Sequence, residues 1–417
     1  MKKHLLLVGA ILFALTVMVG DVFAYNYQYD ASWTRMQARS ATTDAPDAVY
    51  YNPVGTVLMP DGLYLDIGNN MGTKRYEHSF LKANYFDATP SWIMPNVALV
   101  YKKDKGSIFI EMHIPAGGGT LLYRNIYGIG TLLTSVPAGL PLLPSKLKAS
   151  SFWIQGSAGG AFAITDWLAV TAAVRYSQYS IEQAVGYVGL GTISKTKMAA
   201  GAFSGDGGIM ITPIKQLNIT ALYSTEVIAR GVTRDEKTHY SHIDEGRLPD
   251  YLLIGFNVHP IDTVSIQGSY QLTFSQQRNY GTSYAVDLAT GTILNNFSYS
   301  YMTLTGTSLG GNIQDYKMKL NHKVGLGGEF QVHKMVAVSL GVSFESQDAN
   351  PRAQVPFDPD LANIGVGLGL KITPIERFSI QIGGAKYSYF TEKMMFGLIK
   401  MNKSVWSGSI SLTGKLI

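Results

Sequence analysis

Four side chains near the middle of the chain are of the types that bind metal ions: His239, His242, Asp244 and Glu245. Imidazole and carboxylate groups close together in sequence can hold zinc, which activates water for hydrolysis. However, the spacing is loose, the surrounding residues are polar, and the chain has no cysteine to complete such a site. A solvated loop is the favoured interpretation, so we expect neither a metal ion nor another cofactor.

A glycine-rich run and the scattered serines and histidines could also carry chemistry, but they lack the context that it needs. The run 205–208 reads Gly-Asp-Gly-Gly. It does not lie between a strand and a helix, where a phosphate-binding loop would stand. A Ser-His-Asp triad, as in a phospholipase or a protease, cannot be recognised from spacing alone. The sequence therefore favours a protein that is not an enzyme.

The elements that hold these residues are expected to be strands, because polar and apolar residues alternate along much of the chain. Residues 264–274 and 406–416 alternate almost strictly, which gives a strand one apolar and one polar face. In a soluble sandwich, the apolar faces pack together inside. In an outer-membrane barrel, they face lipid and the polar faces line the lumen. The alternation by itself leaves both architectures open.

Residues 1–24 have the three parts of a secretory signal peptide. Lys2 and Lys3 precede an apolar run, and Val22-Phe23-Ala24 forms a small-residue cleavage site. The alternative, an uncleaved membrane anchor, is disfavoured because the apolar run is short and ends at Gly20. The lack of cysteine excludes disulfides and a lipid-modified N-terminus. We expect an exported protein whose mature chain begins at Tyr25.

Composition favours the barrel over the soluble sandwich. Charged residues make up 15% of the chain, against about 25% in typical soluble proteins. Glycine contributes 44 residues, and the 25 tyrosines outnumber the 17 phenylalanines. Strand formers, glycine and interfacial tyrosine are typical of lipid-facing barrels. The net charge of +5 is small for this length and no dense basic cluster is present, so nucleic acid is not expected as a partner.

Short turns of similar sequence recur between the alternating runs. Several contain a Thr-Pro or His-Pro pair, in which proline fixes φ and donates no hydrogen bond to the sheet. Longer connections are expected near 71–94, 114–149, 180–196, 226–248, 275–316, 345–360 and 391–404. Fourteen strands are then expected near 62–70, 95–101, 107–113, 150–164, 168–179, 197–211, 217–225, 250–258, 264–274, 317–332, 335–344, 362–372, 378–390 and 405–417. This topology predicts that residues 62–417 form an all-β fold, a transmembrane antiparallel β-barrel.

Residues 25–61 precede the first expected strand and do not alternate. Because a barrel of this size has a lumen wide enough to need filling, we predict that they form a plug, or hatch. Within them lie Asp44-Ala45, Ala48 and the run Asn52-Pro53-Val54-Gly55. This segment resembles the N-terminal signature of the FadL/TodX family of outer-membrane long-chain fatty acid and hydrocarbon transporters. The chain differs at Val54, where alanine is usual, and at Ile417, where such barrels often end in an aromatic residue.

The resemblance implies a mechanism as well as a fold. In that family a hatch closes the lumen, extracellular loops offer an apolar landing surface, and a kink in the third strand opens the wall toward the membrane. The matching hatch residues here are Asn52, Pro53 and Gly55. The implied kink falls on a proline and glycines that interrupt strand pairing, although the same residues could simply begin a loop. They are Pro115, Gly117, Gly118 and Gly119.

The landing surface that the resemblance implies falls on a long uncharged stretch after this kink. Its prolines and glycines exclude a membrane-spanning helix, and so large an exposed apolar loop implies a partner. Arg124, Lys146 and Lys148 could pair with a substrate carboxylate, although loop cations are usually only solvated. The apolar landing residues are Leu121, Leu122, Ile126, Leu132, Leu133, Leu140 and Leu142.

The predicted function is passive transport of a hydrophobic small molecule, with long-chain fatty acids as the first candidate. The transporter is expected to be a monomer in the outer membrane, surrounded by lipid and lipopolysaccharide. Substrate would be captured by the apolar loops and released through the wall. The alternative is a general porin or an adhesin-type surface barrel. A porin favours an empty lumen with charged constriction residues, so the plug and the apolar loop favour the transporter.

Overall fold

The computed structural model describes residues 30–80, 83–126, 145–187, 191–236, 241–275, 282–286, 293–298, 319–347, 361–394 and 399–417. Residues 1–24, the expected signal peptide, lie outside this part of the chain, as do most of the expected landing residues. Among the described residues, no helix has both the length and the apolar character needed to cross a membrane.

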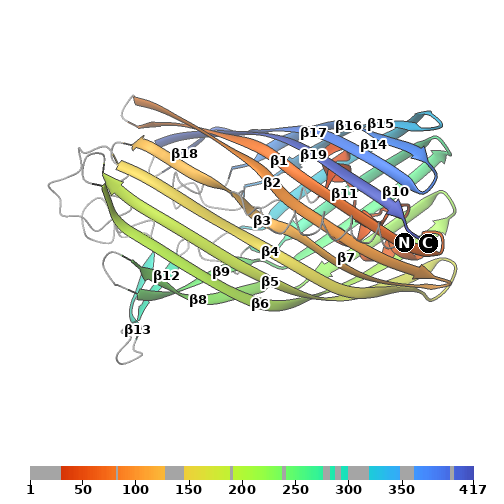
Figure 1. Cartoon of the computed structure of the whole chain (residues 1–417), viewed down its shortest axis with the longest axis horizontal. Helices are drawn as coiled ribbons and strands as arrows, with labels where there is room; N and C mark the ends of the chain where they lie inside the picture. The colour runs from red at the N-terminus through yellow and green to blue at the C-terminus, as the bar shows by residue number, and fades with distance from the viewer. Residues whose placement is uncertain are drawn as a thin grey trace, which may run out of the picture.

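The strands form one antiparallel sheet that closes on itself, because the first strand pairs with the last (Figure 1). Five spans carry two labels each, namely β7/β8, β9/β10, β11/β12, β13/β14 and β17/β18, so the barrel has fourteen strands, as predicted. The strands are β1(Gly62–Phe80), β2(Ala83–Lys103), β3(Gly106–Ile126), β4(Ser145–Ala163), β5(Leu168–Tyr187), β6(Gly191–Ile214), β7(Leu217–Ser224), β8(Val227–Asp235), β9(Ser241–Leu248), β10(Tyr251–Ile261), β11(Val264–Thr273), β12(Thr282–Val286), β13(Ile293–Ser298), β14(Asn321–His333), β15(Val336–Glu345), β16(Asn363–Ile375), β17(Phe378–Tyr389), β18(Glu392–Met394) and β19(Ile399–Lys415).

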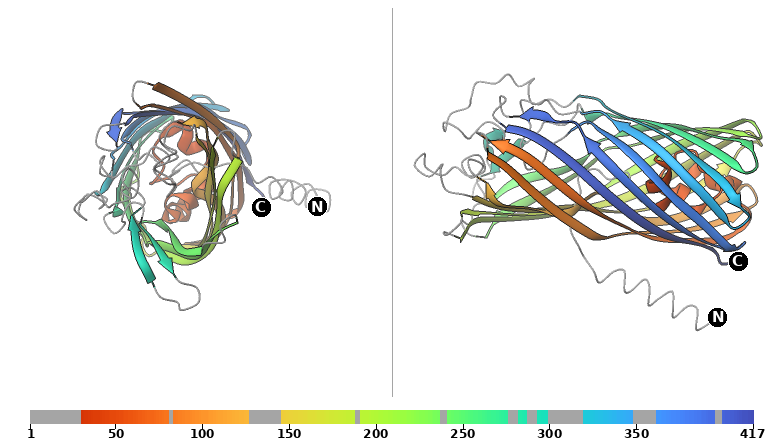
Figure 2. Two further views of the ribbon diagram at one scale, coloured as in Figure 1. Left: turned by 90° about the vertical axis from the view of Figure 1, so that its left-hand side faces the viewer. Right: turned by 90° about the horizontal axis from the view of Figure 1, so that it is seen from above.

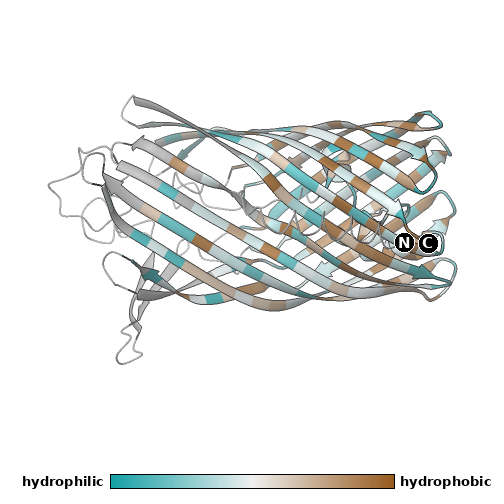
Figure 3. Cartoon of the chain, in the orientation of Figure 1, coloured by the Kyte–Doolittle hydropathy of each residue, from teal (hydrophilic) through white to brown (hydrophobic). Residues whose placement is uncertain are grey.

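The two-residue alternation separates the two faces of the wall. Along β16, Ile364, Val366 and Leu368 are exposed on the outside, and the glycines between them are buried against the lumen. Figure 3 shows hydrophobic and hydrophilic residues interspersed along the strands of the barrel. An outward apolar face on a closed barrel is the pattern of a membrane-spanning wall. The barrel is therefore transmembrane, and the soluble sandwich is excluded.

Several expected loops are strands in the structure. The loop expected at 71–94 is wrong, because β1 continues to Phe80 and β2 begins at Ala83. The loop at 226–248 is wrong as well, because it contains β8 and β9. The connections expected at 114–149 and 180–196 are shortened in the same way. Beyond the bilayer, neither face of a strand needs to be apolar, so the alternation that reveals strands disappears there.

The barrel wall is taller on one side than on the other. Strands β1 to β6 have 19 to 24 residues, whereas β15 to β17 have 10 to 13. A tilted strand needs only about 9–11 residues to cross a bilayer. The tall side therefore extends well beyond the membrane at the end opposite the short turns (Figure 1).

Three of the short turns share one geometry. The strand pairing skips residues before Ile214, Ile261 and Ile375, each of which then pairs with the first residue of the next strand. The proline of each turn falls within this bulge, where its missing N–H is not needed for the ladder. All three isoleucines are exposed. The repeated Pro-Ile sequence therefore builds a bulged hairpin with an apolar tip.

Residues 30–61 lie inside the barrel near its short-turn end, where Figure 2 shows them enclosed by the strands. They form the helix α2(Ala31–Met36) and the 3-10 helices η1(Pro46–Tyr50) and η2(Pro53–Leu58). Nearly all of their side chains are buried. We keep the name hatch for residues 30–61.

Four inward-facing glycines let the hatch backbone lie directly on the wall, and we call them the glycine seat. A Cβ atom added at Gly341 would lie 1.8 Å from the Met36 carbonyl oxygen, and one at Gly327 would lie 2.0 Å from the same atom. Added Cβ atoms at Gly325 and Gly367 would meet other α2 and C-cap carbonyl oxygens at 2.1 and 2.2 Å. Any side chain at these positions would displace α2 from β14, β15 and β16.

Candidate functional site

The motif that suggested a hatch has a clear local structure. Asn52 caps η2, its side-chain Oδ1 accepting from the Val54 N–H at 3.4 Å, and Pro53 occupies the first turn, where no N–H is required. Gly55 packs so closely on the preceding hatch segment that an added Cβ would lie 1.7 Å from the Thr42 carbonyl oxygen. The motif thus folds the hatch back on itself.

Buried ion pairs hold the hatch together and join it to the wall. Arg39 makes a two-pronged contact with Asp47, at 2.8 Å through Nη2 and 3.0 Å through Nε. Arg35 pairs with Glu329 of β14 and donates to Gln381 of β17 at 2.9 Å. Paired and hydrogen-bonded charges tolerate burial, whereas a charge left alone there is costly. The hatch is therefore anchored by specific contacts on the β14–β17 side.

The wall between β2 and β3 is paired over only part of its height. The ladder runs from the Lys103–Gly106 pair to the Val97–Met112 pair and has no further pairs among the described residues. Above this point β2 still pairs with β1, and β3 still pairs with β4. Other neighbouring pairs in this part of the barrel, such as β4 and β5, remain paired over their full length. The described wall is thus interrupted between β2 and β3.

The interruption begins where β3 changes direction. The pairing of β3 with β4 shifts between His113 and Ala116 and again after Gly117, which has a φ of 87°. An added Cβ at Gly117 would lie 2.4 Å from the Phe152 Cα, so only glycine fits this bulge. Pro115 lies within the first shift and supplies no N–H to either neighbouring strand. Gly118 and Gly119 continue as backbone of β3, so the alternative that these residues begin a loop is not what the structure contains.

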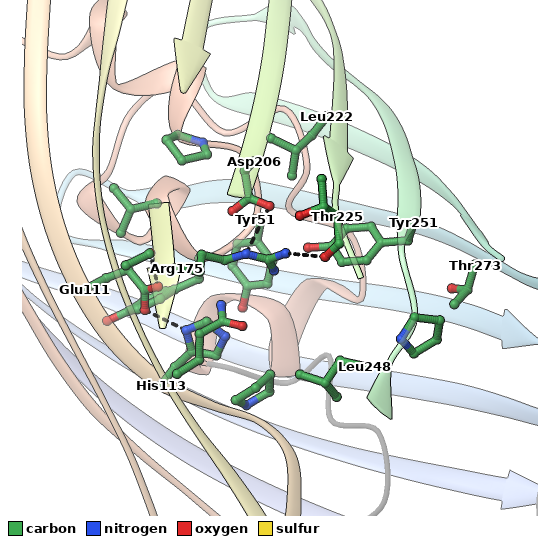
Figure 4. A pocket seen from close by; sticks show the side chains of 17 residues that line it. Tyr51, Glu111, His113, Arg175, Asp206, Leu222, Thr225, Leu248, Tyr251 and Thr273 are labelled. Carbon is green, nitrogen blue, oxygen red and sulfur yellow. Dashed lines mark hydrogen bonds and ion pairs between the residues drawn. The ribbon is translucent and has the colours of Figure 1, made fainter. Parts of the chain in front are cut away.

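A small cavity lies between the kinked strand and the hatch (Figure 4). Its volume is about 40 Å³, close to the roughly 30 Å³ that one water occupies and far below the ~300–1,000 Å³ of typical ligand pockets. The cavity is therefore too small for a ligand of ordinary size as it stands. The cavity is lined by Val49, Tyr50, Tyr51, Pro53, Glu111, His113, Pro115, Gln155, Ser157, Arg175, Asp206, Leu222, Thr225, Leu248, Pro249, Tyr251 and Thr273.

One hydrogen-bonded Glu–His pair and one ion pair face this cavity. Glu111 Oε2 lies 2.6 Å from His113 Nδ1, and the Ser157 hydroxyl donates to the other Glu111 oxygen. Arg175 donates through Nη2 to the Thr225 carbonyl oxygen at 2.9 Å, and its Nε lies 3.3 Å from Asp206 Oδ1 without hydrogen-bond geometry. Figure 4 shows both pairs around the cavity. The cavity thus offers a buried guanidinium with donor capacity to spare.

The sequence motifs do not identify these four titratable residues. The structure places them around the cavity together with tyrosine side chains. One signal was present: Glu111 and His113 interrupt the otherwise apolar run of β3 two residues apart, which puts both on the lumen face. Arg175 and Asp206 come from separate strands, and only the barrel register brings them together.

The expected landing residues are only partly within the described chain. Leu121, Leu122 and Ile126 belong to the end of β3, while Leu132, Leu133, Leu140 and Leu142 lie outside the described residues. Among the expected carboxylate partners, Lys148 is exposed on β4. Arg124 and Lys146 are placed only as backbone of β3 and β4. Of these three cations only Lys148 has a described side chain, and it does not line the cavity.

The residues first considered for metal binding do not form a described site. His239 lies outside the described residues, and His242, Asp244 and Glu245 are placed as backbone of β9. Within the part of the chain that the structure describes, no group of three or more histidine or acidic side chains has the geometry to hold a metal ion.

The fold and the site define a class: a closed transmembrane barrel with its N-terminal segment in the lumen and one interrupted wall. Solved channels share this fold. A *Pseudomonas aeruginosa* FadL homologue matches with a TM-score of 0.70 at 12% identity, covering 95% of this chain and 100% of its own. The *Pseudomonas putida* toluene transporter TodX matches with a TM-score of 0.66 at 13% identity, covering 96% and 100%.

A third channel, the *Ralstonia pickettii* toluene transporter TbuX, matches with a TM-score of 0.61 at 14% identity over 91% of this chain and 97% of its own. No protein-family model and no curated protein sequence matches the chain. The chain therefore has the fold of the FadL/TodX channels, and the resemblance seen at the hatch motif is confirmed at the level of the fold.

Proposed function

We propose that the protein is a passive outer-membrane channel for hydrophobic molecules that carry an acidic head group, long-chain fatty acids first among them. The solved channels of this fold include a FadL homologue and toluene transporters. A molecule of this kind enters from the loop end, passes the luminal cavity and leaves sideways between β2 and β3. The apolar end of β3, which includes Leu121 and Leu122, and the residues that follow it serve as its landing surface.

The observation that carries the proposal is the end of the β2–β3 ladder at Val97 and Met112. Seven paired residues of β3 rise above the short turn, which corresponds to roughly 18 Å for a tilted strand. The apolar band of such a barrel is about 25 Å tall. The interruption therefore begins inside the outer part of the bilayer, where an apolar molecule is soluble.

The charged cavity supports an acidic head group over a neutral hydrocarbon. A neutral molecule in the cavity would further desolvate the Arg175–Asp206 pair without offering it a partner. A carboxylate would instead accept hydrogen bonds from the guanidinium donors that face the cavity. Its alkyl chain would extend toward Leu222 and Leu248, which line the same cavity.

A cross-linking experiment tests the lateral path, and the absence of cysteine from the chain makes it direct. Met94 of β2 and Ile114 of β3 belong to one apolar cluster above the end of the ladder. Met94→Cys with Ile114→Cys, joined by a short bifunctional maleimide, should hold the two strands together. We expect uptake of oleate into vesicles to fall at least tenfold on cross-linking and to recover with a cleavable linker.

The matched control is Val97→Cys with Met112→Cys, which joins two residues that the ladder already pairs. This cross-link should leave uptake unchanged, because it restricts no opening. If both cross-links were equally harmless, the molecule would leave by another route. If both blocked uptake equally, the linker itself would be the obstacle.

A general porin is the second candidate, because the lumen wall carries inward-facing cations. Lys74, Lys323 and Lys403 are buried on the inner face of β1, β14 and β19. Charged constriction residues are typical of channels for polar solutes. Steady open-channel conductance of the intact protein in a planar bilayer, together with failure to bind oleate, would favour this function.

A further inference from the structure

The outer wall carries a groove close to the short turns, away from the luminal site. Its volume is about 600 Å³. Outward-facing positions of β2 to β5 form it in register: Tyr101 pairs with Ile108, Ile108 with Gly160, and Gly160 with Ala172. The small residues at Gly160 and Ala172 leave a depression beside the larger exposed side chains. The groove is lined by Tyr101, Lys103, Gly106, Ser107, Ile108, Gly160, Ala161, Phe162, Val170, Thr171 and Ala172.

This groove faces the membrane. Tyr101, Ile108 and Phe162 are exposed on the outside of the barrel, while Ser107 and Ala161, their neighbours in sequence, are buried against the lumen side. In a membrane-spanning barrel the outward residues contact lipid. The groove is therefore a lipid-facing depression and not part of the transport path through the lumen.

The short turns indicate the height of the groove in the bilayer. Ile214, Ile261 and Ile375 are exposed at the tips of three short turns, so the boundary between the apolar region of the bilayer and its head groups lies at about that level. Lys103 pairs with Gly106 beside another short turn, at the same end of the barrel. It therefore lies at the head-group level, and the rest of the groove extends into the acyl region.

Lys103 is available for an anionic partner at this level. Its side chain is exposed, and within the described part of the chain it makes no salt bridge. The nearby Asp61 carboxylate pairs with Lys102 at 3.2 Å instead. The pKa of Asp61 is lowered mainly by the hydrogen bond that the Asp104 backbone N–H donates to its carboxylate. The charges of Lys102 and Lys103 lower it further. The groove thus combines an apolar surface with one cation at its head-group end.

We propose that the groove binds a glycerophospholipid of the leaflet on the short-turn side. One acyl chain lies over Gly160 and Ala172 between Ile108 and Phe162, and the phosphate contacts the Lys103 ammonium. The charge of Lys103 selects a phosphate-bearing lipid over an uncharged one, because a lysine at a membrane surface attracts anionic head groups. The shape of the depression distinguishes this lipid from those that merely surround the barrel.

Native mass spectrometry of the full-length protein in detergent, titrated with phosphatidylglycerol, tests this site. The wild type should retain one phospholipid at low lipid-to-protein ratios. Ala172→Leu should remove this adduct, because the larger side chain fills the groove. The barrel should tolerate the change, because Ala172 is exposed and its neighbour Gly207 leaves open space. Lys103→Gln should weaken binding about fivefold, the effect of one surface charge, and leaves the groove shape intact.

Two matched controls lie on the same barrel. Ala158→Leu enlarges an exposed alanine of β4 that does not line the groove. Lys215→Gln removes an exposed lysine from a different short turn. Both should bind phospholipid as the wild type does. Heat-modifiable electrophoretic mobility shows that each variant is folded. Equal retention in Ala172→Leu and Ala158→Leu, or unchanged affinity in Lys103→Gln, would overturn the proposal.

Three further ligands separate the possible sources of the signal. Diacylglycerol with the same acyl chains should bind more weakly than phosphatidylglycerol, and inorganic phosphate alone should not bind. Oleate should not displace the phospholipid at equal concentration. Displacement by oleate would assign the groove to transported substrate, and equal binding of diacylglycerol would remove the role of Lys103. Each of these two results would contradict the site as proposed.

Discussion

At the scale of single residues, the hatch buries two carboxylates, those of Asp30 and Asp47. Asp30 caps α2, accepting from the Trp33 N–H at 2.9 Å and from the Tyr51 hydroxyl at 2.5 Å. Burial, together with the negative charge of Asp47, raises the pKa of Asp30 to about 7, although Arg39 opposes the shift. The docked hatch therefore binds a proton that a solvated aspartate would release near pH 4.

This pKa predicts that the hatch docks more firmly at low pH. A raised pKa gives stability that is complete below about pH 4 and is lost as the pH rises to about 7. The loss amounts to at most about tenfold per pH unit in the docking equilibrium. Hydroxyl-radical footprinting of Trp33 and Met36, normalised to the exposed Trp167, should show increasing oxidation between pH 4.5 and 7.5. Asp30→Asn keeps both accepted hydrogen bonds and should abolish the slope; a slope that persists would place the titration elsewhere.

Arg175 provides the residue-scale test of substrate class. Arg175→Gln combined with Asp206→Asn leaves no lone charge in the cavity, and it should weaken oleate binding about tenfold or more, the value of a charge-assisted hydrogen bond. Binding of dodecane should change little. Asp206→Asn alone keeps the guanidinium and should retain oleate, so the two variants are a matched pair in native mass spectrometry. Equal loss of oleate and dodecane binding in the double variant would argue against a head-group role.

At the scale of elements, the two halves of the hatch are held differently. Helix α2 rests on the glycine seat of β14, β15 and β16, where side chains are excluded. The helices η1 and η2 contact the opposite wall, where η2 packs through Val54 and Val57 against Ala161 and Met210. Side chains can slide past one another more easily than backbone seated on backbone. The half of the hatch beside the interrupted wall is held by such side-chain packing and by side-chain hydrogen bonds, as between Thr56 and Ser107 at 2.6 Å.

Gly341→Ala is the sharpest test of the glycine seat. The added methyl group would lie 1.8 Å from the Met36 carbonyl oxygen, so it should destabilise docking of α2 by about 1–3 kcal/mol, as overpacking does. Amide exchange of α2 should accelerate roughly tenfold or more, while the barrel stays folded. Gly207→Ala adds the same methyl group where nothing lies within 4 Å and should change nothing. Unaltered exchange in Gly341→Ala would mean that α2 is not held there.

The sequence predicts the elements of the wall better than their lengths. Strands β14 to β17 lie where lipid imposes a two-residue period on the sequence. Their expected bounds therefore agree with the bounds in the structure to within a few residues. The upper parts of β1, β2, β8 and β9 lie beyond that constraint and were predicted to be loops. Pro115 and Gly117 mark the irregular pairing of β3 with β4, and their role in a lateral opening stays a prediction. The cavity could not be predicted, because Arg175 and Asp206 come together only through the register of β5 and β6.

At the scale of the whole molecule, the barrel and the hatch are separable in principle. The sheet closes through β1 and β19 without any contribution from the hatch. Deletion of residues 25–47, which removes α2 and the Arg39–Asp47 pair, should therefore leave a folded barrel with a higher conductance in planar bilayers. Heat-modifiable mobility checks the folding. A deletion variant that fails to fold, or one that folds and conducts like the intact protein, would contradict a plug role for this segment.

The interrupted wall has a consequence for the bilayer around it. Where two strand edges face each other without a ladder, peptide groups that a closed barrel would pair must find other partners, and hydrocarbon offers none. We expect water from the lumen to supply those partners, so that the seam between β2 and β3 is a hydrated notch in the wall. Lipids beside such a notch would adapt by thinning the leaflet locally. The membrane next to this protein should therefore be deformed on the β2–β3 side of the barrel.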